Sequence, residues 1–147
     1  MRNRGFTFIE ILMVMIIIGV IAAFGIPRLR NSLDKQNVRS AKALLATLVA
    51  TTSSVAVSRG CPATLNLTVD SAWVTACGVS PPAASVQVGT KKLIGDDFNV
   101  KLAPSVSTVI YDPRGISTGY TVVTVGVVGT AVTDSVIINQ LGKVVRQ

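Results

Sequence analysis

Few side chains in this sequence are suited to chemistry. The 147 residues include no histidine, seven acidic residues and two cysteines, so the commonest general base and metal ligand of proteins is missing. Asp96 and Asp97 follow Gly95 and are interpreted as a solvated turn, not a metal site. Gly115 and Gly119 are interpreted as turn glycines, because no phosphate-binding loop or nucleophile elbow surrounds them. The sequence therefore predicts neither an enzyme nor a bound cofactor or metal.

One carboxylate has an unusual setting. Glu10 is the sole ionisable residue of the run from Phe6 to Ile26. As a helix rising about 1.5 Å per residue, this run is about 31 Å long, close to the roughly 30 Å hydrocarbon core of a bilayer. An ionised carboxylate inside a membrane is costly and usually has a partner. Glu10 is therefore expected either to meet a cation or to stay protonated and unpaired near the interface.

Two other interpretations of the apolar run are open. One is a buried core helix, but a chain this short has little protein to surround a helix that is apolar on every side. The other is a secretory signal peptide, with an apolar stretch of about 7–15 residues followed by a small-residue cleavage site. The small pair Ala22-Ala23 instead lies inside a much longer run. The run is predicted to remain in the protein as an N-terminal anchor.

Two sequence features conflict about the side of the membrane on which the C-terminal part of the chain lies. Arg2 and Arg4 precede the run and more basic residues follow it, so counting basic residues alone would place the C-terminal part inside the cell. The two cysteines, Cys61 and Cys77, lie in one loop-like segment and form a natural pair, which fits an oxidising compartment. Two unrelated reduced thiols are the alternative.

The N-terminus carries a resemblance to a known family. The stretch Arg4-Gly5-Phe6-Thr7-Phe8-Ile9-Glu10-Ile11-Leu12 resembles the processing site of type IV pilins and type II secretion pseudopilins. The resemblance implies that prepilin peptidase cuts between Gly5 and Phe6 on the cytoplasmic side and that Phe6 is N-methylated. It also implies that Glu10 pairs with the N-terminal amine of a neighbouring subunit during filament assembly, which neutralises both groups and sets the axial register.

The anchor is expected to bend where it ends. Pro27 lacks an amide hydrogen and is predicted to kink or loosen the helix, and Gly25 adds slack. The resemblance assigns the same helix-weakening role to Gly19 and Pro27. Arg28 and Arg30 are expected to contact anionic lipid headgroups of the inner membrane or acidic residues of neighbouring subunits.

An amphipathic helix is predicted to continue over residues 28–58 and to end near 58–60, where a glycine and a proline follow. Its apolar residues recur at spacings of about three and four. They are Leu29, Leu33, Ala41, Leu44, Leu45, Leu48, Thr52 and Val55.

Residues 59–147 differ in composition, since the part from Ala63 onward is rich in valine, threonine, serine and glycine. Short β-prone runs separated by turn residues predict strands. The run Tyr120–Val128 is apolar on both faces and is expected to be a central strand. The predicted strands are Ser85–Val88, Asn99–Ala103, Thr108–Tyr111, Tyr120–Val128, Ser135–Asn139 and Lys143–Arg146.

Two steps in this region carry a second resemblance. The step Val109–Gly115 holds an aromatic-x-Pro-x-Gly pattern, and the step Val136–Val144 holds an Asn-x-x-Gly-basic pattern. Their order and spacing resemble the GspH/FimT group of minor pilins and pseudopilins. This resemblance implies a scarce subunit near the filament tip that helps to start assembly. A major pilin is the alternative, because the N-terminal motif is common to both.

A further implication of this group concerns DNA. DNA-binding FimT-like pilins carry a C-terminal Gly-Arg-x-Arg motif, whereas this chain has Gly142-Lys143-Val144-Val145-Arg146. The extra residue moves a side chain to the other face of an extended tail, and lysine lacks the planar fork of arginine. Lys143 and Arg146, with Arg114 nearby, are candidate phosphate ligands. Solvated terminal charges are the simpler interpretation.

The predicted architecture is a pilin-like α+β protein, in which one long N-terminal helix, transmembrane in its first half, packs on a mainly antiparallel β-sheet head. Its parts are a cleaved leader (1–5), a transmembrane and assembly helix (6–27), a helical continuation (28–58) and the β-rich part (59–147). The expected location is the inner membrane, single-pass with the head in the periplasm, and then a pilus or secretion pseudopilus. The expected partners are other pilins, prepilin peptidase and lipid, with DNA as an alternative.

Overall fold

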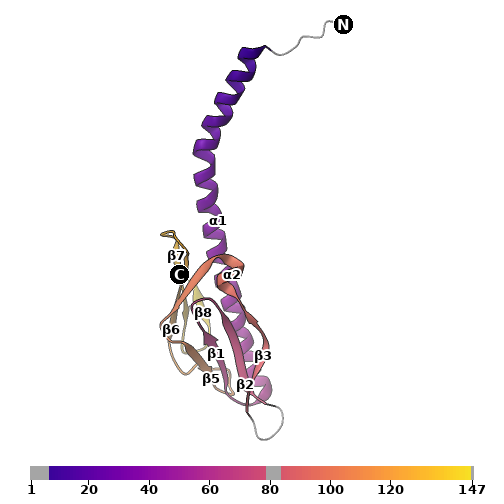
Figure 1. Cartoon of the computed structure of the whole chain (residues 1–147). Helices are drawn as coiled ribbons and strands as arrows, with labels where there is room; N and C mark the ends of the chain where they lie inside the picture. The colour runs from indigo at the N-terminus through magenta and orange to yellow at the C-terminus, as the bar shows by residue number, and fades with distance from the viewer. Residues whose placement is uncertain (1–6, 79–83, 147) are drawn as a thin grey trace. The chain divides into compact units, whose positions relative to one another are not determined.

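The computed structural model describes residues 7–78 and 84–146. The chain divides into two compact units, Met1–Asp34 and Lys35–Gln147, which we call the anchor unit and the head unit. Helix α1 (Phe8–Arg59) begins in the first and ends in the second (Figure 1). The expected leader and the expected cut between Gly5 and Phe6 lie outside the described residues.

In the anchor unit α1 has no protein core. The apolar side chains of residues 8–26 are nearly all exposed, and Phe8 and Phe24 are 82% and 72% exposed. This helix carries a stretch long and apolar enough to cross a membrane. The helix is uninterrupted across Gly19, Gly25 and Pro27, so a kink or loosening at these positions stays a prediction.

In the head unit one face of α1 forms the centre of the core. The buried positions recur every three or four residues, and the sequence pattern predicts four of them, Ala41, Leu45, Leu48 and Thr52. Leu29 and Leu33, from the same pattern, lie in the anchor unit and are exposed. The pattern missed three buried apolar residues of α1, because small and basic neighbours interrupt it: Val38, Val49 and Ala56.

Two antiparallel sheets cover this face of α1 instead of the single sheet that the sequence suggested. The first has the order β3-β2-β1-β5. Its strands are β1 (Ala63–Leu67), β2 (Ala72–Cys77), β3 (Ser85–Lys92) and β5 (Thr108–Tyr111). The second has the order β4-β6-β7-β8. Its strands are β4 (Val100–Pro104), β6 (Thr121–Val127), β7 (Thr133–Ile138) and β8 (Val144–Arg146).

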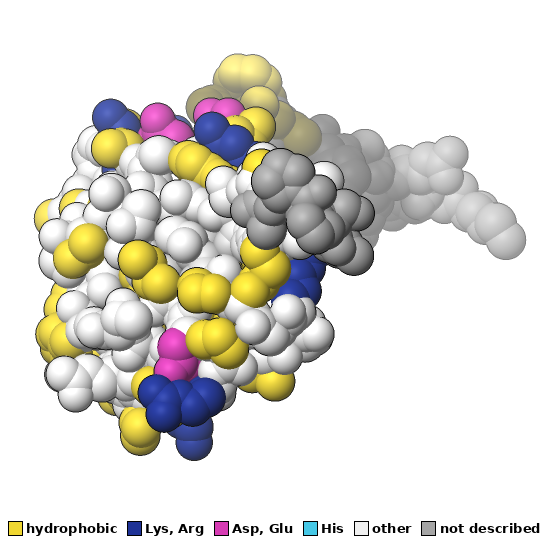
Figure 2. Space-filling view, turned by 90° about the horizontal axis from the view of Figure 1, so that it is seen from below, with side chains coloured by type: hydrophobic (Ala, Val, Ile, Leu, Met, Phe, Trp, Pro, Cys, Tyr) yellow, Lys and Arg dark blue, Asp and Glu magenta, His cyan; other side chains and the backbone are white. Residues whose placement is uncertain are grey.

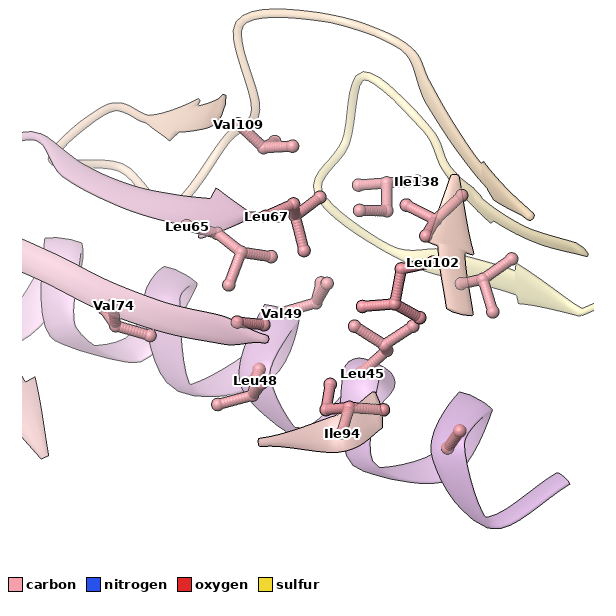
Figure 3. Close-up of a cluster of buried hydrophobic side chains, with 14 of the residues drawn as sticks. Leu45, Leu48, Val49, Leu65, Leu67, Val74, Ile94, Leu102, Val109 and Ile138 are labelled. Atoms are coloured by element: carbon pink, nitrogen blue, oxygen red, sulfur yellow. The ribbon is translucent and has the colours of Figure 1, made fainter. Parts of the chain in front are cut away.

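The core lies between α1 and the inner faces of both sheets. Figure 3 shows Leu45, Leu48 and Val49 of α1 close to side chains of both sheets, among them Leu65 and Leu102. Strand β6 is internal, as expected, yet its residues alternate between buried and less buried positions. Of its outward residues Val122 is apolar, and the exposed Tyr120 and Val128 flank the strand, which explains why the sequence suggested burial on both faces.

Two strands and one helix of the head unit were not predicted from sequence. β1 and β2 occupy the segment that was interpreted as a loop around the cysteines, and their inward positions include the alanines Ala63, Ala72 and Ala76. Alanine is depleted in strands, so the alternation is weak in the sequence. Asp96 and Asp97 lie in the short helix α2 (Ile94–Phe98) and not in a simple turn.

The predicted cysteine pair is confirmed. Cys61 and Cys77 form a disulfide with a Cα–Cα distance of 6.3 Å. The bond joins the end of α1 to the end of β2, and the Arg59 guanidinium donates a 2.7 Å hydrogen bond to the carbonyl of Cys77. Closing a loop with a sequence separation of 16 residues restricts the unfolded chain and contributes about 3 kcal/mol to stability.

Candidate functional site

Glu10 lies in the first turn of α1. The helix begins with the amide groups of Glu10 and Ile11 donating to the carbonyl of Thr7, at 3.1 and 3.3 Å. A negative side chain is favourable at this end, because the unpaired amide groups of a helix N-terminus carry partial positive charge. The Glu10 side chain is exposed, so within the anchor unit it is open to a partner from outside. The pairing with an N-terminal amine stays a prediction.

The two segments that resemble the GspH/FimT group, Val109–Gly115 and Val136–Val144, lie side by side in the head unit. A Cβ atom built on Gly142 would be 3.1 Å from the carbonyl oxygen of Gly115 and 2.6 Å from Cε1 of Tyr111. A Cβ atom on Gly115 would be 2.7 Å from Oγ of Ser53 on α1. Both glycines have positive φ, 79° and 70° for Gly115 and Gly142, so both the backbone and the space favour glycine. The two turns are therefore packed against each other, against Tyr111 and against α1.

Side chains fix the first of these turns. Asp112 Oδ1 accepts hydrogen bonds from the backbone amides of Arg114 (3.0 Å) and Ile116 (2.9 Å), and Oδ2 accepts one from Arg114 Nε (2.8 Å). The Ile116 amide, with help from Arg114, lowers the pKa of the Asp112 carboxyl. Ser53 Oγ of α1 donates to the Gly115 carbonyl at 3.0 Å. Arg114 is thus already paired with Asp112, which reduces its availability as a phosphate ligand.

The second turn holds the C-terminal strand. The amide of Lys143 donates to Asn139 Oδ1 at 2.8 Å, and the amide of Asn139 donates to the Lys143 carbonyl at 3.0 Å. Tyr111 beneath the turn is fully buried, and burial raises the pKa of its hydroxyl to about 12. The Lys143 side chain is exposed. It borders a groove of ≈ 450 Å³ between the C-terminal strand and α1, whose other lining residues are Ala46, Val49, Ala50, Ser53, Ser54, Leu141, Gly142 and Val144.

A buried cation on α1 was missed in the sequence. Lys42 is 7% exposed, and its Nζ donates to Oδ2 of Asp134 on β7. Oδ1 of the same carboxylate accepts from the amide of Ser135 at 2.7 Å. The hydrogen bond from Lys42 is the main cause that lowers the pKa of the Asp134 carboxyl. The signal that could have found this pair is a lysine within the apolar stripe of α1 together with a single aspartate in a valine-rich hairpin.

We expect Asp134→Asn to destabilise the head unit by about 1–2 kcal/mol at pH 7, because Lys42 would stay buried without its counter-charge. The figure is discounted for solvent screening, since the Asp134 side chain is 38% exposed. A carboxyl whose pKa is lowered on folding adds stability above its unfolded pKa and loses it as the pH falls through the folded value. The difference in the free energy of unfolding between the wild type and Asp134→Asn should therefore become smaller below about pH 4.

Urea unfolding of residues 35–147 at pH 7 and pH 2.5 measures this difference. Asp97→Asn, which removes an exposed carboxylate without a described ion pair, is the matched control and should change little. An equal loss at both pH values would show that the Asp134 effect is not electrostatic.

Among the described residues, no group of three or more histidine, cysteine, aspartate or glutamate side chains is arranged to hold a metal ion. The candidate features of the chain are therefore the exposed anchor with Glu10, the paired turns that hold the C-terminal strand, and the charged side chains around Lys42.

Known proteins resemble this chain at two levels. Residues 1–26 match the prokaryotic N-terminal methylation motif. The fold is similar to the type IV minor pilin FimU of Pseudomonas aeruginosa in two crystal forms, with TM-scores of 0.59 and 0.57 at 14% identity. The similarity covers 76% of this chain and 89% of FimU in one form, and 74% and 91% in the other. No curated protein matches the chain by sequence.

The motif and the fold are two separate findings. At 14% identity the likeness to FimU is one of fold alone, and the methylation motif covers only residues 1–26. The chain therefore carries a prokaryotic N-terminal methylation motif and has a pilin-like fold, with a long N-terminal helix packed on antiparallel β-sheets.

Proposed function

We propose that this chain is a prepilin that is cut between Gly5 and Phe6, methylated on Phe6 and built into a filament by its N-terminal helix. The observation that carries the proposal is the methylation motif on a helix whose apolar side chains have no protein cover in the anchor unit. Such a surface is stable in lipid or against other apolar helices. The helix anchors the precursor in the inner membrane, with the head in the periplasm, and later packs inside the filament.

Within this class we favour a minor subunit, of a type IV pilus or a type II secretion pseudopilus, over a bulk subunit. FimU, which shares the fold, is itself a minor pilin. Charge also supports this choice. The head unit has ten basic and five acidic residues, a net charge of +5. The other four of the 14 basic residues and two of the seven acidic residues lie in the anchor unit: Arg2, Arg4, Arg28, Arg30, Glu10 and Asp34. Identical basic neighbours repel one another, whereas a single copy among less basic subunits avoids that cost.

Sheared filaments from the native host test this role. We expect mass spectrometry to find the chain beginning at an N-methylated Phe6, in a much smaller amount than the main subunit. Deleting the gene should reduce the number of filaments by about tenfold or more. A chain that still begins at Met1, that begins after Ala23, or that is the most abundant subunit would contradict the proposal.

DNA binding is the second candidate function. The observation in its favour is that the turn of Arg114 and the turn before Lys143 pack together, as the Gly115–Gly142 contact shows. Two observations weigh against a strong site: Arg114 is paired with Asp112, and the groove beside Lys143 contains no second cation among its lining residues. Figure 2 shows basic side chains in a few separate groups on the face seen from below, and not in one continuous stripe.

A filter-binding or mobility-shift assay with residues 35–147 tests DNA binding. If DNA is bound, Lys143→Ala/Arg146→Ala should weaken binding about tenfold or more and flatten its dependence on salt, because each lost phosphate contact lowers the salt slope by about one. Lys92→Ala/Lys101→Ala, which removes the same charge from exposed positions of other strands, should have a smaller effect. No shift of DNA at low salt would rule the function out for the head unit.

A further inference from the structure

A charged notch lies in the head unit between α1 and the start of β7. It has a volume of ≈ 190 Å³. Its α1 wall carries Lys35 and Arg39, which are four residues apart and so lie on one face of the helix. The opposite wall is the hairpin segment that leads into β7. The lining residues are Lys35, Val38, Arg39, Val132, Thr133 and Asp134.

The charges of the notch are unbalanced. Its one acidic residue, Asp134, already accepts from Lys42 with one carboxylate oxygen and from the Ser135 amide with the other. Arg39 lies close enough to help lower the pKa of Asp134, yet no ion pair joins them or involves Lys35 among the described contacts. Like charges at i and i+4 of a helix repel each other and destabilise it. Among the residues that the structure describes, Lys35 and Arg39 therefore form a cationic pair without an anion of its own.

The floor of the notch is apolar. Val38 is 2% exposed, and Val132 packs partly against the core. The volume equals about six water molecules at roughly 30 Å³ each, which is the scale of one side chain. A ligand would match both parts of this surface if its aliphatic chain packed on the two valines and its anionic group lay between Lys35 and Arg39. An aspartate or glutamate side chain has this form.

We propose that the notch of Lys35, Arg39 and the β7 hairpin binds an acidic side chain of a neighbouring, different filament subunit. The inference rests on the proposed function and deepens it by naming the chemistry of one subunit contact. The net charge of +5 on the head unit disfavours a second copy of this chain as the neighbour.

The binding chemistry can be tested on residues 35–147 without any filament. Sodium acetate is the probe, and backbone amide shifts of Val132, Thr133 and Asp134 are followed by NMR against sodium chloride at equal ionic strength. We expect saturable shifts at least threefold larger with acetate than with chloride. Lys35→Gln/Arg39→Gln should abolish the excess. Equal shifts with the two salts would overturn the inference, whatever the chain does in a filament.

The filament contact is tested with the full chain in its host. Lys35→Glu/Arg39→Glu should leave membrane insertion and processing unchanged but lower the amount in sheared filaments at least tenfold. The matched control is Lys92→Glu/Lys101→Glu, which makes the same charge change at exposed positions on β3 and β4 and should incorporate normally. An acidic-to-lysine change in one neighbouring subunit should restore the notch variant.

Three results would overturn the contact. One is normal incorporation of the notch variant. The second is an equal loss in the control, which would make net charge the cause. The third is that the notch variant binds phosphatidylglycerol vesicles less well than the wild type, relative to phosphatidylcholine vesicles, while its incorporation into filaments is unaffected. That result would assign the notch to lipid. Absence of the wild-type chain from filaments would instead contradict the proposed function, and with it a filament contact.

Discussion

Replacement of Glu10 by valine is expected to leave the chain in the membrane and correctly cut, but to lower its amount in filaments at least tenfold. Valine removes the one ionisable residue of the run Phe6–Ile26, so insertion is not impaired. What is lost is the one anion of this apolar run, whose side chains have no protein cover in the anchor unit. Cutting after Gly5 would create a cationic amine on Phe6, and in an apolar filament core an amine without a counter-charge is costly.

The measurement compares three fractions of the same cells: total membranes, the processed chain and sheared filaments. Glu10→Asp, which keeps the charge on a shorter stem, is the matched control and should retain more incorporation than Glu10→Val. Glu10→Gln, which keeps the size without the charge, should behave like valine. Normal incorporation of both uncharged variants would show that Glu10 is an unpaired, protonated residue and would remove it from the assembly mechanism.

Gly142→Ala should destabilise the head unit by about 2–4 kcal/mol. Part of this loss, about 1 kcal/mol, comes from the left-handed backbone with φ at 70°. The rest is steric, because the new methyl group would be 2.6 Å from the ring of Tyr111 and 3.1 Å from the Gly115 carbonyl, and overpacking costs about 1–3 kcal/mol. Tyr111 is fully buried in the core and has little room to move away.

A second glycine separates the two causes. Gly129 has nearly the same backbone conformation, with φ at 80°, but a Cβ atom there would meet nothing within 4 Å. Gly129→Ala should therefore lose only about 1 kcal/mol, and the difference between the variants in urea unfolding is the steric part. Equal losses of stability in the two variants would mean that the turn at Gly142 adjusts to the added methyl group at little cost. The C-terminal strand with Lys143 would then not be firmly held against Tyr111.

The candidate residues differ in how far the sequence reveals them. Glu10 can be identified from the sequence alone, because it is the single charge in a long apolar run. The disulfide of Cys61 and Cys77 could be expected because the chain has only two cysteines. Lys42 could not be interpreted in this way. A lysine in an amphipathic helix is usually solvated, and it is the fold that brings Asp134, 92 residues away in the sequence, to its ammonium group.

The same distinction holds for the strands. β5, β6 and β7 are visible as runs of β-branched and aromatic residues, whereas β1 and β2 have alanine at several inward positions. Local propensity underestimates such strands, because their stability comes from packing against other elements.

By itself the sequence determined the class of N-terminus, the apolar anchor with its single carboxylate, the extent of α1 and the β-rich nature of the rest. Each of these depends on neighbours within a few residues or on one unbroken run. Only the tertiary structure decided that there are two sheets, that the Gly115 and Gly142 turns pack together over Tyr111, and that Lys35 and Arg39 face a notch whose one carboxylate is already taken. These features depend on contacts between distant segments, which local sequence patterns do not encode.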